Sequence, residues 1–130
     1  MNTNGWQVLV VEDENDSIKM VSKILSHHGI QVFVANNGRE CLTRLNELSP
    51  TLVVMDLAMP EMDGWETLHH MRANPVSAHI PVVAITAYHS ANVANDAVQA
   101  GFDAYFPKPL DPKTFVTDLA EVVGIEPCIT

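Results

Sequence analysis

The stretch Val53–Pro60, VVMDLAMP, places a single aspartate directly after a run of β-branched and apolar residues. A short continuous apolar run of this kind predicts a strand that is buried on both faces of a parallel sheet. A carboxylate at the end of a buried strand is expensive to desolvate unless a partner or a ligand uses it. Asp56 is therefore the first candidate for a functional residue.

Other apolar runs extend this pattern along the chain. Residues 8–11 (VLVV), 52–55 (LVVM) and 80–85 (IPVVAI) are continuous and predict central strands. Residues 30–35 (IQVFVA) and 102–106 (FDAYF) are more mixed and predict edge strands, and the prolines at 107 and 109 fit the end of an edge strand.

Helical periodicity fills the intervals between these runs. The second helix is expected to carry Leu42, Leu45 and Leu48, and the third to begin at an Asp63–Glu66 capping pair. The first is expected to end at Gly29, the fourth to carry residues 93–98 and stop at Gly101, and the fifth to be opened by Asp111–Pro112.

Strict alternation of five strands and five helices predicts one α/β domain. We expect a five-stranded parallel sheet in the flavodoxin-like order 2-1-3-4-5, because the first, third and fourth strands are the most apolar, with helices on both faces. The domain should span residues 1–130, with a core of about 6–124 and a short C-terminal tail at 125–130.

Composition narrows the classes of partner. The chain has a formal net charge of −9, and its 7 scattered basic residues argue against nucleic-acid binding. No apolar run approaches the ~18 residues of a membrane span and no basic leader opens the chain, so we expect a cytoplasmic protein without a membrane partner. Cys41 and Cys128 lack a paired spacing and are interpreted as free thiols.

The carboxyl ends of the predicted strands carry the polar residues that ligands would meet. They are Glu12, Asp13, Asp56, Thr86, Ala87 and Lys108. Three crowded carboxylates require countercharge, since two unit charges ~4 Å apart interact by roughly 4 kcal/mol at an effective dielectric constant of about 20. A cluster of hard oxygen ligands suits Mg²⁺ or Mn²⁺ and leaves room for a phosphate oxygen.

These residue types indicate phosphoryl chemistry. Asp56 stands apart from Glu12 and Asp13 and is the candidate nucleophile that would form an aspartyl phosphate. Lys108 would neutralise charge on the transferred oxygens, and the Thr86 hydroxyl would hydrogen-bond one of them. Ala87 is small enough to leave that approach open.

Four motifs together resemble the receiver domain of two-component response regulators, in particular the single-domain, chemotaxis-regulator-like type. They are VLVVEDE at 8–14, MDLAMPEMDG at 55–64, ITAY at 85–88 and YFPKPL at 105–110. The resemblance implies that a histidine kinase or a histidine phosphotransfer protein gives a phosphoryl group to Asp56. It also implies Mg²⁺ contacts from Asp13, Asp56 and the backbone carbonyl of Ala58, with Glu12 acting through water.

The same resemblance implies a switch. Thr86 would move toward the phosphoryl group while the ring of Tyr105 rotates between outer and inner positions. The surface of the fourth helix, fifth strand and fifth helix would then bind a downstream protein, and the peptide bond before Pro109 would be cis. Ala58 and Tyr88 depart from the common family pattern, and we predict that Tyr88 partly covers the phosphoryl group and slows attack by water.

Other functions remain open at this stage. A haloacid-dehalogenase-type phosphatase needs a second aspartate two residues after the nucleophile, where this chain has Ala58. A flavodoxin needs a loop rich in Ser, Thr and Gly after the first strand, where this chain has EDEND. A phosphorylation-independent adaptor would not need the full set of polar residues. We expect a signalling receiver with only self-phosphorylation and self-dephosphorylation chemistry, either a stand-alone regulator or part of a hybrid kinase or larger regulator.

Overall fold

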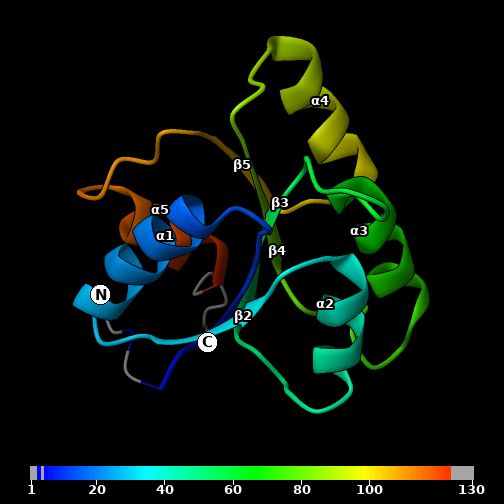
Figure 1. Ribbon diagram of the computed structural model, residues 1–130, viewed down its shortest axis with the longest axis horizontal. Helices are drawn as coiled ribbons and strands as arrows, with labels where there is room; N and C mark the ends of the chain where they lie inside the picture. Colours follow the sequence, from blue (N-terminus) through cyan, green and yellow to red (C-terminus); the bar gives the residue numbers. More distant parts are fainter. Residues whose placement is uncertain (1–2, 4, 124–130) are drawn as a thin grey trace.

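A five-stranded parallel sheet in the order β2-β1-β3-β4-β5 forms the centre of the protein (Figure 1). The computed structural model describes residue 3 and residues 5–123. The strands are β1 (Gln7–Val11), β2 (Gln31–Ala35), β3 (Leu52–Asp56), β4 (Val82–Thr86) and β5 (Ala104–Pro107). The predicted strand order is confirmed, and the continuous apolar runs form the three central strands.

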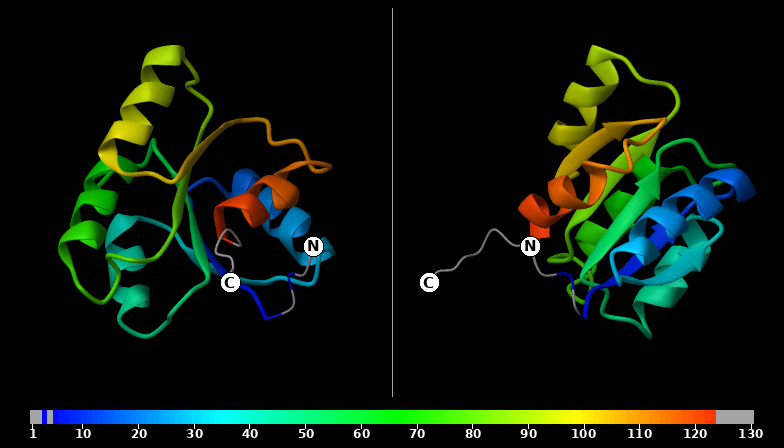
Figure 2. Two further views of the ribbon diagram at one scale, coloured as in Figure 1. Left: turned by 180° about the vertical axis from the view of Figure 1, so that it is seen from behind. Right: turned by 90° about the vertical axis from the view of Figure 1, so that its left-hand side faces the viewer.

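Helices cover both faces of the sheet, as Figures 1 and 2 show. α1 (Asn15–His27) and α5 (Phe115–Val123) pack on one face, and α2 (Gly38–Leu45), α3 (Gly64–Ala73) and α4 (Ala91–Ala100) pack on the other. Successive strand residues point to opposite faces. Leu9 and Val53 therefore join the core beneath α2, α3 and α4, whereas Val10 and Val54 join the core beneath α1 and α5.

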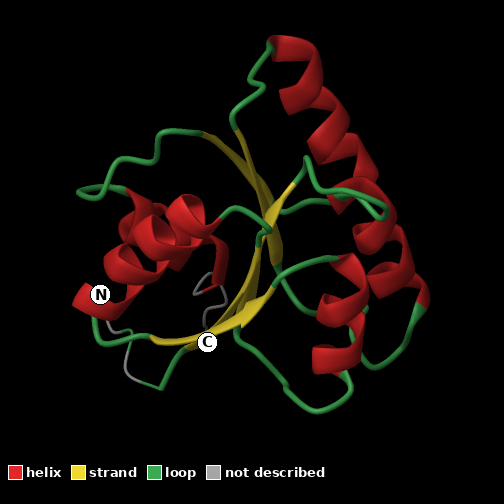
Figure 3. Cartoon of the chain, viewed as in Figure 1, coloured by secondary structure: helices red, strands yellow, loops and turns green. Residues whose placement is uncertain are grey.

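The cartoon in Figure 3 shows the loops that join each strand to the next helix. The loop after β3 is held tightly. The Gly64 amide donates to the Leu57 carbonyl at 3.1 Å, and a Cβ atom at Gly64 would lie only 2.5 Å from the Asp56 carbonyl oxygen. Asp63 then caps α3 by accepting from the Glu66 amide at 2.9 Å, which confirms the predicted capping pair. This loop fixes α3 against the end of β3.

Two predicted helix boundaries were wrong. α2 ends at Leu45 and does not reach Leu48, because the Asn46 and Glu47 amides donate to carbonyls three residues back and tighten the chain into a turn. Asp111 does not open α5 directly. Its side chain accepts from the Lys113 amide at 2.9 Å in a turn, and the helix itself begins at Phe115.

Strand bounds also shift slightly. β4 begins at Val82, after Pro81, and not at residue 80, while β5 begins at Ala104 and not at residue 102. Cys41 is a buried free thiol, and burial raises its pKa to about 12. Cys128 and the expected tail at 125–130 lie outside the described residues. None of the helices within residues 5–123 is long and apolar enough to cross a membrane.

Candidate functional site

A polar cleft of about 180 Å³ lies at the carboxyl edge of the sheet. β1, β3 and β5 deliver side chains to it because parallel strands end at the same edge. The cleft is lined by Glu12, Asp13, Glu14, Asp56, Ala58, Ala87, Tyr88 and Lys108. A larger hollow of about 520 Å³ lies between α2 and α3, but no carboxylate or lysine lines it, so size does not identify the site.

Three carboxylates meet in this cleft. One oxygen from each of Glu12, Asp13 and Asp56 lies within 4.8 Å of the other two. Glu12 and Asp56 are buried, at 0% and 5% exposure, whereas Asp13 faces solvent. Three negative groups against one lysine leave negative charge uncompensated, and carboxylate oxygens are the ligands that Mg²⁺ prefers. The donor set therefore fits a hard divalent cation.

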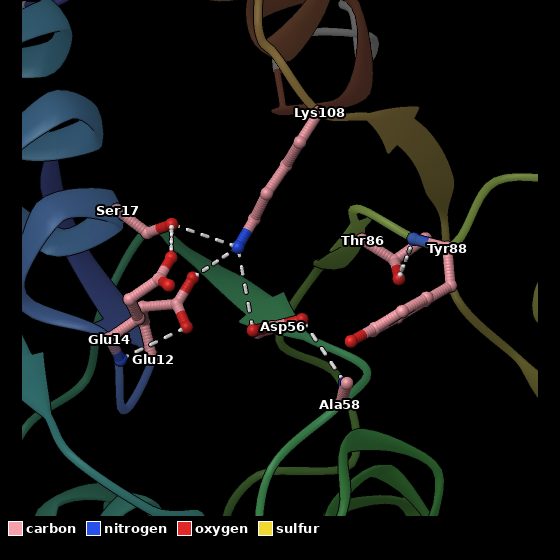
Figure 4. Close-up of polar contacts among 8 residues, drawn as sticks. All are labelled: Glu12, Glu14, Ser17, Asp56, Ala58, Thr86, Tyr88 and Lys108. Carbon is pink, nitrogen blue, oxygen red and sulfur yellow. Dashed lines mark hydrogen bonds and ion pairs between the residues drawn. The ribbon is translucent and has the colours of Figure 1, made fainter.

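Lys108 is the positive group of the site. Its Nζ donates to Glu12 Oε1 at 2.6 Å, to Ser17 Oγ at 3.0 Å and to Asp56 Oδ2 at 3.5 Å, as Figure 4 shows. Figure 4 also shows that the lysine reaches down from the end of β5 toward the carboxylates beside β1 and β3. The ammonium is thus placed between two buried anions.

The pKa values reflect the excess of carboxylates. Burial first, and then hydrogen bonding with Asp56, raise the pKa of Glu12 to about 7, although Lys108 opposes this shift. Burial lowers the pKa of Lys108, but the hydrogen bond to Glu12 and the charges of Asp56 and Glu12 outweigh it and raise the pKa overall. The two shifts are compatible because one lysine serves several acids. The lysine stays charged while a glutamate gains affinity for a proton.

Both oxygens of Asp56 have partners. Oδ2 faces Lys108, and Oδ1 accepts from the Ala58 amide at 3.1 Å. The Ala58 residue is exposed, so its small side chain leaves the approach to Asp56 open. Asp56 is therefore fixed in orientation while one side of its carboxylate faces the cleft.

The loop after β4 borders the other side of Asp56. Thr86 is 2% exposed, and its Oγ1 accepts from the Tyr88 amide at 3.0 Å. Thr86 lines a small adjoining hollow of about 140 Å³ together with Ala58 and Tyr88. Tyr88 is 74% exposed, and its ring extends toward Asp56 and Ala58 in Figure 4. The side chain of Thr86 is therefore bonded within its own loop.

Tyr105 lies apart from the cleft. Its hydroxyl is 2.7 Å from His89 Nδ1, and the two rings stack with centroids 5.5 Å apart. The Lys108–Pro109 peptide bond is cis. The structure thus brings most of the predicted residues to one cleft but leaves Tyr105 on a neighbouring surface beside His89.

Sequence reasoning missed Glu14 and Ser17. Ser17 Oγ donates to Glu14 Oε1 at 2.9 Å while accepting from Lys108, and the Glu14 amide donates to Glu12 Oε2 at 3.3 Å. Both residues lie at the start of α1, where polar residues are usual at any helix N-terminus. The only sequence signal is their closeness to Glu12 and Asp13.

Comparisons with known proteins agree with the fold. The model of the response regulator receiver domain matches residues 8–120. An uncharacterized 14.6 kDa protein of Leptolyngbya boryana is 39% identical over 105 residues, covering 81% of this chain and 80% of that protein. The polar-differentiation response regulator DivK of Brucella anthropi is 29% identical over 117 residues, covering 90% and 95%.

The chain is also similar to part of a longer protein and to proteins of solved structure. The regulatory protein AtoC of Escherichia coli is 36% identical over 105 residues, which make up 81% of this chain but 22% of that protein. The structure of the Vibrio cholerae chemotaxis protein CheY4 superposes with a TM-score of 0.83 at 27% identity, covering 90% of this chain and 98% of that one. The match to AtoC therefore concerns one part of a larger protein.

Proposed function

Since the chain belongs to the response regulator receiver domain family, a family of two-component signalling modules, we propose that Asp56 is its phosphoryl acceptor. The observation that carries this proposal is the position of Asp56. It ends a central strand, and its carboxylate lies among Glu12, Asp13 and Lys108 in one open cleft. The donor would be a histidine kinase or a histidine phosphotransfer protein.

The transfer can be built from the contacts of Asp56. An Asp56 carboxylate oxygen forms a bond to phosphorus while the P–N bond of the donor phosphohistidine breaks, and the bonding electron pair leaves with the imidazole nitrogen. Lys108 donates a hydrogen bond to a phosphoryl oxygen, and the Ala58 amide holds the carboxylate in orientation. The phosphoryl group is lost in a separate hydrolysis step: water attacks phosphorus, the bond between the Asp56 oxygen and phosphorus breaks, the carboxylate is regenerated and inorganic phosphate leaves.

Mg²⁺ is the proposed cofactor, with Mn²⁺ as a substitute. Asp13, Asp56 and the backbone carbonyl of Ala58 would hold the ion, with Glu12 acting through water. When bound, the ion neutralises charge on the carboxylates and on the transferred oxygens. This assignment is supported by three carboxylate oxygens, one each from Glu12, Asp13 and Asp56, that lie within 4.8 Å of one another.

The switch is proposed to run through the loop after β4. Thr86 would exchange its bond to the Tyr88 amide for one to a phosphoryl oxygen, with Ala87 leaving space for the movement. Tyr105 would change its ring position, which requires release from His89. The surface of α4, β5 and α5 would then bind the downstream protein. β4 and β5 support this coupling because they are neighbours, with Thr86 opposite Pro107 and Ala84 opposite Tyr105.

Incubation with acetyl phosphate and Mg²⁺ tests the proposal directly. We expect intact-mass spectrometry to show the addition of one phosphoryl group that is retained at mildly acidic pH but lost in alkali, as an acyl phosphate should be. The Asp56→Asn variant should remain unmodified, while the matched control Asp96→Asn, on the exposed side of α4, should react like the wild type. Modification of Asp56→Asn would place the acceptor at another residue, and no modification of the wild type would favour an adaptor role; either result contradicts the proposal.

A further inference from the structure

The hydrogen-bond capacity of Lys108 is already full in this structure. An ammonium has three protons, and three acceptors surround Nζ: Glu12 Oε1 at 2.6 Å, Ser17 Oγ at 3.0 Å and Asp56 Oδ2 at 3.5 Å. A phosphoryl oxygen on Asp56 would be a fourth acceptor. Lys108 can bind it only if one of the present contacts is given up or exchanged.

Glu14 sets the orientation of the Ser17 hydroxyl toward Lys108. A hydroxyl has one proton, and Ser17 Oγ gives it to Glu14 Oε1 at 2.9 Å. The oxygen therefore offers a lone pair to Lys108, from which it accepts. Ser17 is only 6% exposed, so its hydroxyl is held by these two partners and not by bulk water. Glu14 thus keeps Ser17 in the orientation that receives the lysine.

The two short contacts of Lys108, with Glu12 and with Ser17, differ in what would be left without a partner if the lysine moved away. Glu12 is fully buried, and losing Lys108 would leave its carboxyl group without the hydrogen-bonding cation that compensates its burial. Ser17 is neutral and retains its bond to Glu14 after Lys108 departs, so no buried polar group is left without a partner. Of the two short contacts of Lys108, the one with Ser17 is therefore released more readily than the one with Glu12.

We propose that Ser17, oriented by Glu14, is a positioning residue that holds Lys108 in the unphosphorylated protein and is exchanged for a phosphoryl oxygen upon activation. The inference rests on the proposed function, because it assumes that a phosphoryl group binds at Asp56. It adds a specific consequence: the Ser17 hydroxyl competes with the phosphoryl group for the same ammonium and so opposes the activated state.

Binding of beryllofluoride, a phosphoryl analogue, measures this competition. In saturating Mg²⁺, we expect Ser17→Ala to bind beryllofluoride about tenfold more tightly than the wild type, which corresponds to one hydrogen bond to a charged group. Ser17→Thr retains a hydroxyl and should restore the wild-type affinity. A purely structural role would lower thermal stability in Ser17→Ala and leave the affinity unchanged.

Glu14 offers a second variant at an exposed position, where folding is not at risk. Glu14→Ala frees the Ser17 hydroxyl to rotate, and we expect a smaller gain in beryllofluoride affinity. Asp16→Ala is the matched control, since it removes the same charge from the same exposed turn. Equal gains in the two variants would mean that only overall charge matters, which would overturn the role of Glu14.

A metal-free readout separates this inference from the proposed function. The ¹⁵N and ¹H resonances of the Lys108 ammonium should show a restrained group in the wild type and a more mobile one in Ser17→Ala, whether or not phosphorylation occurs. If the wild type fails to bind beryllofluoride, the proposed function fails. If the wild type binds it but Ser17→Ala binds no more tightly, or if the ammonium dynamics do not change, the inference about Ser17 is wrong and the proposed function stands.

Discussion

Charged side chains meet at both ends of the sheet, but they are balanced at only one of them. At the amino ends of β4 and β5, Arg72 pairs with Asp103 at 3.1 Å, and the same Asp103 oxygen accepts from the Val82 amide at 2.8 Å. The remaining guanidinium bonds go to the carbonyl oxygens of Ala78, Ile80 and Gly101. One cation, one anion and several backbone dipoles satisfy one another there.

The carboxyl end of the sheet has the opposite arrangement. Three carboxylates share one lysine, and the pKa of Glu12 rises to about 7 as a result of burial and crowding. A protein whose only requirement was stability would not keep such a cluster, because buried unpaired charge is strongly destabilising. The contrast teaches that charge balance, rather than the mere presence of ion pairs, separates a structural cluster from a candidate functional one.

Disrupting the ion pair between Arg72 and Asp103, at the amino ends of β4 and β5, should have the largest effect on stability. We expect Arg72→Ala to lower the free energy of unfolding by about 3 kcal/mol, because three carbonyls and Asp103 lose a charged donor at once. Urea denaturation measures this change, with Arg39→Ala, an exposed arginine of α2, as the control. Modification by acetyl phosphate should persist in the folded variant. Loss of that modification would show that the two ends are not independent.

Supplying positive charge as Mg²⁺ to the carboxylate cluster at the carboxyl end of the sheet should stabilise the folded protein. Mg²⁺ at about one hundred times its dissociation constant should raise the free energy of unfolding by about 2.7 kcal/mol, since it binds only the folded site. Excess EDTA should reverse the effect, as followed by urea denaturation. Asp13→Asn should lose most of this response, whereas Arg72→Ala should keep it. An equal response in Asp13→Asn would place the ion elsewhere.

The pH dependence of stability should report on Glu12 in the absence of metal. Its pKa of about 7 lies above its ordinary value of 4.5, so between these values the folded protein holds a proton that the unfolded chain releases. The free energy of unfolding should therefore fall as pH rises through this window, by on the order of 1–2 kcal/mol given the screening by Lys108. Glu12→Gln should lack this slope in urea titrations at about pH 5 and about pH 7.

Glu47→Gln provides the control for that titration, because Glu47 is exposed in the turn after α2. Its pH profile should match that of the wild type. If Glu12→Gln and the wild type differ by the same amount at both pH values, then Glu12 does not titrate in this range. The unbalanced cluster would then be compensated in some way other than by proton uptake.

The sequence contains most of what determines the sheet. Continuous β-branched runs identify β1, β3 and β4, and their strict alternation with helices leaves few topologies to choose from. Helix ends were less predictable, because they depend on competing local hydrogen bonds. At Asn46 the chain tightens into a turn and leaves Leu48 outside α2, and at Asp111 the cap serves a turn that precedes α5.

The candidate site likewise contains residues that the sequence predicts and residues that it does not. Asp56, Glu12 and Lys108 can be derived from one rule, that parallel strands end at a common edge. Ser17 cannot be derived from it, since its contact with Lys108 joins residues 91 positions apart and depends on side-chain direction. Nothing in the sequence separates Ser17 from an ordinary polar residue at the start of a helix. The pairing of Tyr105 with His89 is hidden for the same reason.

Substitution of Tyr88, at the border of the carboxylate cluster, should give the smallest effect of the predicted changes. Tyr88 is 74% exposed and lines the cleft, and its ring extends toward Asp56, so it borders the cleft without being packed into the core. We expect Tyr88→Ala to shorten the lifetime of the phosphorylated protein by roughly threefold to tenfold, less than about 1.4 kcal/mol in barrier height, because water gains access to phosphorus. Loss of phosphate is monitored by intact mass after acetyl phosphate is removed. Tyr88→Phe keeps the ring and should keep the wild-type lifetime of the phosphorylated protein. A shorter lifetime in Tyr88→Phe would assign the protection to the hydroxyl. An unchanged lifetime in Tyr88→Ala would show that Tyr88 does not shield the phosphoryl group.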